Sequence, residues 1–245
     1  MKARTLVIGD IHGAFRALAQ VLERAEVTQQ DTLIFLGDYV DGWSQSRQVI
    51  AHLLNLSESH NCIFMRGNHD TWCEGWLRRR DADLTWLLHG GSSSVDSYDV
   101  YDEEVWQRHL GFFERLKDYH VDEKNRLFIH AGYTSMHGPA REMYSTNFSW
   151  DRTLWEMAVA MDPGIKKDSV LYPKRLKHFA EIYLGHTPTM DYKSEVPMNA
   201  ANVWNIDTGA AFRGKLSLLD ADTKEYWQSD VVKTLYPGEK GRNKD

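Results

Sequence analysis

Residues 5–13 read TLVIGDIHG, and this stretch decides the fold. Its first four residues form a short apolar run typical of a buried strand, and the turn behind them carries Asp10 and His12. Residues 15–25 then place apolar side chains at helical spacing. This order predicts a buried strand that ends in a polar turn and leads into a helix.

The same arrangement occurs twice more before residue 80. Residues 32–42 read TLIFLGDYVDG and residues 62–70 read CIFMRGNHD, and each stretch leads into a helical pattern. Strands that alternate with helices predict a largely parallel sheet, whose strands all end on one edge. We therefore expect the three polar turns to meet in space, at the edge where open α/β sheets bind ligands.

Apolar runs return in the second half of the chain, and their ends are again polar. The runs at 126–129, 182–184 and 203–206 lead into HAG, GHTP and DTG. Between the two halves, residues 105–116 predict an amphipathic helix and residues 90–94, GGSSS, predict a loop. The pattern near the carboxyl end, from residue 216 to residue 228, predicts a closing hairpin.

The composition is that of a packed globular protein. The chain has 245 residues, of which 42% are hydrophobic and 26% charged, which is enough for one sizeable core. We predict a single domain over residues 1–236 and expect the polar tail 237–245 to fray.

Charge and hydropathy exclude several classes of partner. The formal net charge is −6, so no overall field attracts nucleic acid or an anionic membrane, and we expect neither as a partner. No apolar stretch approaches the roughly 20 residues that span a bilayer, there is no signal-peptide pattern, and two cysteines do not make a disulfide framework. These features predict a cytoplasmic protein and carry no signal of its oligomeric state.

Six side chains at the predicted strand ends offer imidazole nitrogen or carboxylate and amide oxygen. They are Asp10, His12, Asp38, Asn68, His130 and His186. An isolated Asp-X-His turn is more often a capped turn, but six such residues in register favour a metal site. Because no thiolate is present, the set suits manganese, iron, zinc or a mixed pair.

The number of candidate ligands indicates two metals. Six ligands are too many for one catalytic metal with an open position, but they suit two metals that share a bridging carboxylate. Two metals roughly 3.5 to 4 Å apart can clamp the phosphoryl oxygens of an in-line displacement, which favours phosphate esters as substrates. His69 is placed to protonate the leaving oxygen if Asp41 or Asp70 keeps it charged, and we favour Asp41 as its partner.

Taken together, the motifs resemble a known family. GDIHG, GDYVDG, GNHD, HAG and GHTP follow one another between residues 9 and 188. They resemble the phosphoprotein phosphatase (serine/threonine phosphatase) family of calcineurin-like metallophosphoesterases, especially its small bacterial and phage members. The likeness continues through IDTGA at 206–210 and so covers nearly the whole chain. It implies a four-layer α/β/β/α sandwich with the metals among the loops of the sheets.

The resemblance also implies a role for each candidate residue. The first metal would be held by Asp10, His12 and Asp38, and the second by Asp38, Asn68, His130 and His186, with Asp38 as the bridge. His69 would be the general acid and Asp41 its partner. Arg152 matches a phosphate-contacting arginine of the family, and Arg66 is a second candidate for that contact.

One departure from the family pattern concerns phosphate binding. The family usually has Asp-Arg-Gly where this chain has Gly42 in place of the arginine. Arg47 or one of the arginines at 78–80 is a candidate replacement. Trp43 lies in the loop beside the site and is a candidate to face substrate, whereas we interpret Trp150 as a core residue.

These observations predict a two-metal phosphoesterase that hydrolyses phosphate monoesters with a bridging hydroxide as nucleophile. The preferred hypothesis is a manganese-dependent phosphatase of the protein serine/threonine type, acting on a phosphorylated protein, a peptide or a small phosphate ester. The alternative is a symmetrical dinucleoside tetraphosphate hydrolase, because GNHD and HAG are also similar to those enzymes. A third hypothesis, a non-catalytic binding module, is disfavoured because the ligands and the His69–Asp41 pair are intact.

Overall fold

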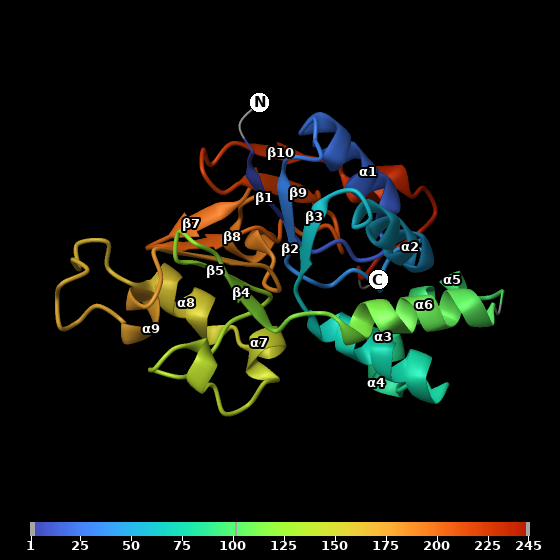
Figure 1. Cartoon of the computed structure of the whole chain (residues 1–245), viewed down its shortest axis with the longest axis horizontal. Coiled ribbons are helices and arrows are strands. Elements are labelled where there is room, and N and C mark those ends of the chain that lie inside the picture. Colours follow the sequence, from blue (N-terminus) through green and yellow to red (C-terminus); the bar gives the residue numbers. More distant parts are fainter. Residues whose placement is uncertain (1–2, 101, 244–245) are drawn as a thin grey trace.

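Two five-stranded sheets lie face to face in the computed structural model, which describes residues 3–100 and 102–243. Helices cover the outer side of each sheet, as Figure 1 shows for α1 and α2 on one side and α8 and α9 on the other. The predicted four-layer α/β/β/α sandwich is confirmed.

The first sheet contains the three strands predicted from the amino-terminal repeats. Its order is β10 (Tyr226–Gln228), β9 (Ser217–Asp220), β1 (Thr5–Ile8), β2 (Thr32–Phe35) and β3 (Asn61–Phe64). The strands β1, β2 and β3 are parallel, with Thr5 opposite Thr32 and Thr32 opposite Asn61. The antiparallel pair of β9 and β10 is the predicted closing hairpin.

The second sheet repeats this design. Its order is β4 (Tyr119–Val121), β5 (Arg126–Ile129), β6 (Glu181–Leu184), β8 (Val203–Asn205) and β7 (Met198–Ala200). The central strands β5, β6 and β8 are parallel, and the edge strands β4 and β7 run antiparallel to them.

Alternation along the strands builds separate hydrophobic layers. In β1, Leu6 and Ile8 belong to the core under the helices, while Val7 packs between the sheets. In β5, Leu127 packs toward helices and Phe128 toward the other sheet. Because successive side chains of a strand point to opposite faces, strands that are apolar throughout become buried on both sides.

The helices that pack on the first sheet are α1 (Phe15–Arg24), α2 (Ser46–Leu56), α3 (Asn68–Arg79), α6 (Glu103–Glu114) and α10 (Val232–Leu235). Those on the second sheet are α7 (Asn147–Trp150), α8 (Thr153–Ala160) and α9 (Lys174–Lys177). Single 3₁₀ turns lie at η2 (Pro139–Arg141) and η3 (Thr189–Tyr192). The helix predicted around residues 105–116 corresponds to α6.

The stretch predicted as a loop at residues 90–94 is helical, so that prediction is wrong. α4 (Leu84–Trp86), a π-helical turn η1 (Leu87–Gly91) and α5 (Ser92–Ser97) follow one another, with a kink at Gly90 where φ is +107°. A Cβ on Gly91 would lie 2.5 Å from the indole of Trp86. These glycines therefore allow a kink and a close ring contact, which local sequence does not distinguish from a loop.

The carboxyl-terminal tail differs from the expected frayed segment over the described residues up to Asn243. The backbone N–H of Arg242 donates to the carbonyl of Ala211 at 2.8 Å, and Ser44 donates to Glu239 through its N–H and its hydroxyl. These bonds fix the tail against the loops that follow β2 and β8. The prediction for the last two residues lies outside the described part of the chain, which contains no helix long and apolar enough to cross a membrane.

Candidate metal centre

The polar turns of both sheets converge on one place, because the parallel strands of each sheet end on one edge and the two edges meet around Asp38, His130 and His186. Several of the residues there have left-handed backbone conformations, with φ of 52° at His12, 52° at Asp38, 73° at Asp41 and 68° at His186. Residues other than glycine seldom adopt positive φ, and such conformations cluster at functional sites. The backbone of these turns therefore adopts unfavourable conformations that direct the side chains toward the site.

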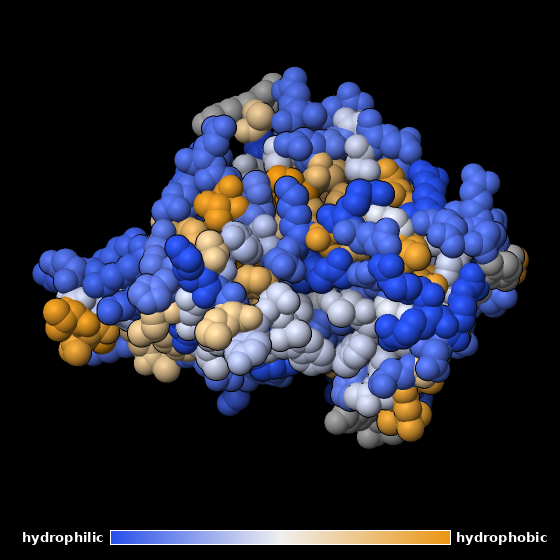
Figure 2. All heavy atoms as spheres, turned by 60° about the horizontal axis from the view of Figure 1, so that its bottom comes forward, coloured by the Kyte–Doolittle hydropathy of each residue, from blue (hydrophilic) through white to orange (hydrophobic). Residues whose placement is uncertain are grey.

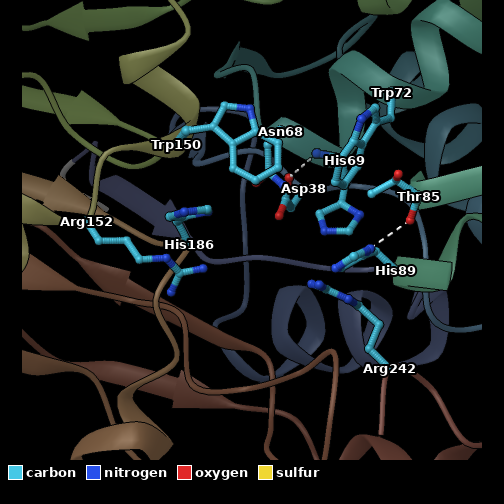
Figure 3. A pocket seen from close by; sticks show the side chains of 10 residues that line it. All are labelled: Asp38, Asn68, His69, Trp72, Thr85, His89, Trp150, Arg152, His186 and Arg242. Atoms are coloured by element: carbon cyan, nitrogen blue, oxygen red, sulfur yellow. Dashed lines mark hydrogen bonds between the residues drawn. The ribbon is translucent and has the colours of Figure 1, made fainter. Parts of the chain in front are cut away.

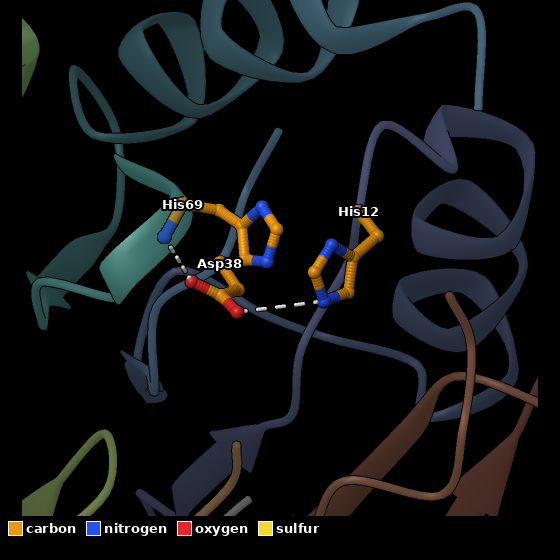
Figure 4. Close-up of side chains that lie close together, drawn as sticks. All are labelled: His12, Asp38 and His69. Atoms are coloured by element: carbon orange, nitrogen blue, oxygen red, sulfur yellow. Dashed lines mark hydrogen bonds and ion pairs between the residues drawn. The ribbon is translucent and has the colours of Figure 1, made fainter. Parts of the chain in front are cut away.

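Asp38 lies at the centre of the candidate ligands. Its Oδ2 is 3.4 Å from Nε2 of His12 and 3.6 Å from Nε2 of His130. Figure 4 shows one carboxylate oxygen directed toward the ring of His12 and the other toward the backbone N–H of His69, and possible ligand atoms of these three residues lie within 4.8 Å of one another. A second such group consists of Asp38, His130 and His186. Because Asp38 belongs to both groups, it occupies the position of a bridging ligand.

Hydrogen bonds determine which imidazole nitrogen faces the centre. Nδ1 of His12 donates to the carbonyls of Val40 and Asp41, each at 3.1 Å, and Nδ1 of His130 donates to the carbonyl of Leu36 at 2.9 Å. This leaves Nε2 of each ring with a lone pair toward Asp38, which is the usual orientation of metal-binding histidines. Nε2 of His130 is also 3.2 Å from Oδ1 of Asn68.

Unsatisfied atoms complete the fit to metal ions. Oδ1 of Asp10 and Nε2 of His186 are buried and have no hydrogen-bond partner, whereas Oδ2 of Asp10 accepts the backbone N–H of His186. A buried carboxylate or imidazole atom without a partner is costly unless a cation binds it. The six predicted ligands therefore lie together with donor atoms suited to two divalent cations.

Two glycines allow the carboxylates to approach the backbone. A Cβ on Gly67 would lie 2.0 Å from Oδ1 of Asp38, and a Cβ on Gly185 would lie 2.0 Å from Oδ1 of Asp10. Any larger residue at either position would displace a predicted ligand. The glycines of GNHD and GHTP are therefore needed at the site, because they leave room for the carboxylates of Asp38 and Asp10.

Burial disfavours the charged form of the acids at the site. Burial raises the pKa of Asp38 to about 7, against the lowering effect of Arg242, and burial raises the pKa of Asp207 to about 7. The pKa of Asp10 is raised well above its ordinary value by burial and then by Asp207 and Asp38. Burial lowers the pKa of His12, so this ring is neutral and available as a ligand. Bound cations would relieve the mutual repulsion of the carboxylates.

His69 is held by Asp41, as the sequence predicted. Nδ1 of His69 is 2.6 Å from Oδ2 of Asp41, which also accepts the indole N–H of Trp86 at 2.6 Å, while Oδ1 accepts the hydroxyl of Ser94 at 2.6 Å. Burial raises the pKa of Asp41 to about 7. This arrangement leaves Nε2 of His69 to face a ligand.

Asp70, the other possible partner of His69, has a structural role. Its carboxylate accepts the backbone N–H groups of Asp38 at 2.8 Å, Tyr39 at 2.9 Å and Gly67 at 2.7 Å. It therefore ties the turn after β2 to the turn after β3 and fixes the position of Asp38.

A cavity of about 300 Å³ opens directly over these residues. Figure 3 shows Arg152 and Arg242 on different sides of it, with Asp38 and His69 between them and Trp72 and Trp150 at its rim. Its lining residues are Asp38, Asn68, His69, Trp72, Thr85, His89, Trp150, Arg152, His186 and Arg242. The pocket thus combines the candidate metal ligands with two guanidinium groups and an aromatic wall.

Two of the arginines singled out from the sequence, Arg66 and Arg47, do not line the cavity. The guanidinium of Arg66 pairs with Glu74 and donates to the carbonyl of Phe113 at 2.6 Å, so the structure does not support Arg66 as a substrate contact. Arg47 donates to the carbonyl of Val100. Arg152, in contrast, lines the cavity as predicted, and its guanidinium is 3.4 Å from the hydroxyl of Thr187.

Trp43 and Trp150 each lie in the environment that the sequence analysis expected for the other. Trp43 is fully buried, donates its indole N–H to the carbonyl of Ala210 at 2.8 Å and stacks on Tyr236, so it does not face substrate. Trp150 is 45% exposed and lies edge-to-face with Trp72 at the cavity rim, so its interpretation as core is wrong.

Besides Trp72, Thr85 and His89 of the cavity wall, sequence reasoning missed four residues that carry or hold charge at the site. Trp86 and Ser94 hold Asp41, Asp207 lies beside Asp10, and Arg242 reaches the cavity from the tail. The DTG motif at 207–209 was a visible signal for Asp207. The others are joined to the site only by long-range contacts, for which the sequence carries no local pattern.

Figure 2 shows the face at the bottom of Figure 1 coming forward. Its surface is mainly hydrophilic to neutral, and the strongly hydrophobic side chains form small separate patches spread over it. This face suits a polar or charged ligand better than a broad apolar partner.

Comparison with known proteins agrees with this geometry. The profile described as Calcineurin-like phosphoesterase matches residues 3–193. The chain is 26% identical over 228 residues to the asymmetrical Bis(5'-nucleosyl)-tetraphosphatase PrpE of Anoxybacillus flavithermus, covering 87% of this chain and 88% of that protein. It is 28% identical over 221 residues to Serine/threonine-protein phosphatase 1 of Salmonella typhimurium, covering 86% and 89%.

Solved structures support the fold. A crystal structure of a putative diadenosine tetraphosphatase matches with a TM-score of 0.63 at 17% identity, covering 93% of each chain. A protein serine/threonine phosphatase from Saccharomyces cerevisiae matches with a TM-score of 0.63 at 16% identity, covering 93% of this chain and 79% of the other.

Proposed function

We propose a function for this chain, which belongs to the calcineurin-like phosphoesterase family, a family of metal-dependent hydrolases. It is a two-metal phosphatase of the protein serine/threonine type, and it hydrolyses phosphate monoesters. The observation that carries this proposal is Asp38, whose Oδ2 lies within 3.6 Å of Nε2 atoms from both His12 and His130. A carboxylate placed between two imidazole nitrogens is in position to bind two cations, each of which would also bind one of the imidazoles.

We assign the ligands as the sequence predicted. Asp10, His12 and Asp38 would hold one divalent cation, and Asp38, Asn68, His130 and His186 the other. We propose manganese for both because the ligands are oxygen and imidazole nitrogen, a set that iron and zinc also accept. When bound, the two cations would neutralise phosphoryl charge and lower the pKa of a water molecule, so that hydroxide is available to attack phosphorus.

The protein's own residues would handle the leaving group and the phosphoryl oxygens. His69 would donate the proton on Nε2 to the departing alkoxide, while the Asp41 carboxylate at Nδ1 keeps the imidazolium charged and oriented. The Arg152 guanidinium at the cavity wall would contact two phosphoryl oxygens at once.

The cavity of about 300 Å³ accommodates a phosphoryl group with one neighbouring side group, and an adjoining cavity that shares Arg152, His186 and Arg242 leaves room for a larger leaving group. The complete ligand set and the intact His69–Asp41 pair favour an enzyme over a non-catalytic binding module.

A dinucleoside tetraphosphate hydrolase is the second candidate, and the aromatic wall favours it. Trp72 and Trp150 have ring centroids 5.1 Å apart at the rim, where an exposed ring can stack on a nucleobase. The sequence predicted the symmetrical kind of this enzyme as the alternative, whereas the relatives are named as asymmetrical tetraphosphatases, so they support the substrate class and not the position of cleavage.

Product analysis on the manganese-loaded protein separates the two candidates. We expect kcat/KM to be highest for a phosphoserine peptide, with inorganic phosphate as product and an aryl phosphate as activity control. A higher kcat/KM for diadenosine tetraphosphate, with only nucleotides released, would replace the first proposal by the second.

The Trp150→Ala variant tests the role of the aromatic wall. Loss of one stacking contact is expected to lower kcat/KM for the dinucleotide roughly 5- to 100-fold, and less for an alkyl phosphate. Equal losses on both substrates would show that Trp150 does not recognise a base.

A further inference from the structure

The backbone around Gly42 leaves a channel that a residue of the carboxyl-terminal tail fills. Gly42 has φ of +108°, and a Cβ there would lie 3.2 Å from Cγ of Arg242. Gly90 has φ of +107°, and a Cβ there would lie 3.1 Å from the same atom. The N–H of Gly42 donates to the carbonyl of Gly90 at 3.2 Å, so the two glycines form one surface. The aliphatic stem of Arg242 lies on that surface.

The tail around Arg242 is fixed in place. The Arg242 N–H donates to the Ala211 carbonyl, and the Asn243 side chain donates to the carbonyl of Phe212 at 3.1 Å. Gly241, with φ of +60°, lies so close to Trp43 that a Cβ would be 2.6 Å from the indole ring.

The neighbouring residues of the tail add further contacts. Glu239 accepts from Ser44 at 3.0 Å and 2.8 Å, and Tyr236 stacks on the indole of Trp43. The residues before Arg242 are therefore held by the loop that contains Gly42, and Asn243 after it is held by Phe212, so the position of the Arg242 backbone is fixed.

The guanidinium of Arg242 faces the site. It lines the cavity over Asp38 and His69 and also an adjoining cavity that contains His12 and Asp207. Arg152 lines both cavities as well, and Figure 3 shows the two guanidinium groups approaching from different elements. The candidates considered from sequence, Arg47 and the arginines at 78–80, do not line either cavity, and Arg78 bonds to Glu74 and Glu114.

We propose that Arg242 is a substrate-binding residue that grips the phosphoryl group opposite Arg152, replacing from the tail the arginine that is absent at Gly42. The proposal rests on the proposed phosphatase function and deepens it. Two guanidinium groups on opposite sides of one phosphoryl group bind it with fixed orientation, because each presents a planar pair of donors. The stem of Arg242 occupies the space that a side chain at position 42 would need, since a Cβ there would lie 3.2 Å from Cγ of Arg242.

The Arg242→Met variant tests the guanidinium while keeping a stem of similar length on the two glycines. We expect kcat/KM of the manganese-loaded full-length protein on an aryl phosphate to fall roughly 10- to 100-fold, the usual effect of losing a charge-assisted hydrogen bond. Binding of inorganic phosphate, measured by calorimetry, should weaken by a similar factor. Arg242→Lys should lie between the wild type and Arg242→Met.

Two controls separate substrate contact from a structural role. Arg115→Ala removes an exposed arginine at the end of α6, outside the cavity, and should retain wild-type kcat/KM. Thermal unfolding and bound manganese should be the same in Arg242→Met and the wild type. A variant that binds phosphate within twofold of the wild type, or that loses its metal, would overturn the proposal.

Failure of the proposed function gives a different result. In that case the wild-type protein releases no phosphate from any ester. The calorimetric comparison of wild type and Arg242→Met with inorganic phosphate still decides whether Arg242 binds a phosphoryl group.

Discussion

Replacing Asp41 by asparagine isolates the charge behind the proposed general acid. The carboxylate accepts three hydrogen bonds of 2.6 Å, from His69, Trp86 and Ser94. An asparagine with its oxygen toward His69 and Trp86 still accepts two of them. Its NH₂ then faces Ser94, whose hydroxyl can rotate to accept. The fold should therefore tolerate the change, with unfolding free energy altered by about 1 kcal/mol or less.

The catalytic cost is much larger, because the protonated His69 loses its counter-charge. Two unit charges about 4 Å apart interact by about 4 kcal/mol at an effective dielectric constant of about 20. Burial already lowers the pKa of His69, so the imidazolium depends on this interaction. We expect kcat to fall roughly 1000-fold for a substrate whose leaving group must be protonated.

The assay compares an alkyl phosphate with an aryl phosphate that leaves as a weakly basic phenolate. Asp41→Asn should reduce kcat strongly on the alkyl ester and much less on the aryl ester. Asp70→Asn is the matched control, since it loosens the turns that hold Asp38 without touching His69. Equal losses of Asp41→Asn on both esters, or less than threefold loss on the alkyl ester, would refute the reasoning.

Two further changes probe the centre and the fold. Gly67→Ala places a Cβ 2.0 Å from Oδ1 of Asp38 and should lower manganese affinity roughly 10- to 100-fold in a titration. Gly111→Ala is the control and should leave manganese affinity unchanged, because its Cβ would meet only the guanidinium end of Arg115 at 3.3 Å. Burial raises the pKa of Asp31, but hydrogen bonds from Arg4 and Thr28 lower it from 3.8 to about 2. Since this folded-state pKa is depressed, its stabilisation of about 2 kcal/mol is present above pH ~4 and is lost as pH falls toward 2. Asp31→Asn should remove that acid dependence in urea unfolding measured between pH 6 and pH 2, and an unchanged slope would contradict the assignment.

Much of the fold could be predicted from the sequence because most strands have a recognisable local sequence pattern. Short apolar runs that end in polar turns indicated β1, β2, β3, β5, β6 and β8. Parallel strands of one sheet end on one edge, so Asp10, His12, Asp38 and Asn68 were expected to meet, as were His130 and His186 on the second sheet. The meeting of these two groups depends on how the sheets pack against each other. The choice of Asp41 over Asp70 as the partner of His69 agrees with the geometry because both turns were correctly placed.

The remainder depends on contacts between distant segments. Arg242 reaches Gly42 across about 200 residues of chain, and no periodicity links a polar tail to a missing side chain. The helical turn at Gly90 was mistaken for a loop because glycine and serine favour turns, whereas here the backbone approaches Trp86 and Ser94 bonds to Asp41. Trp150 was assigned to the core because hydrophobicity does not distinguish a packed ring from one at a cavity rim.

The most direct test of a two-metal phosphatase is to count bound manganese and measure phosphate release from a phosphoserine peptide, for the wild-type protein and for Asp38→Asn. Two ions per wild-type chain are expected, with hydrolysis that a chelator abolishes and added manganese restores. The variant, which lacks the shared carboxylate, should bind fewer ions and release no phosphate. Wild-type hydrolysis that survives complete removal of metal, or an Asp38→Asn protein that retains both ions and full activity, would contradict the account.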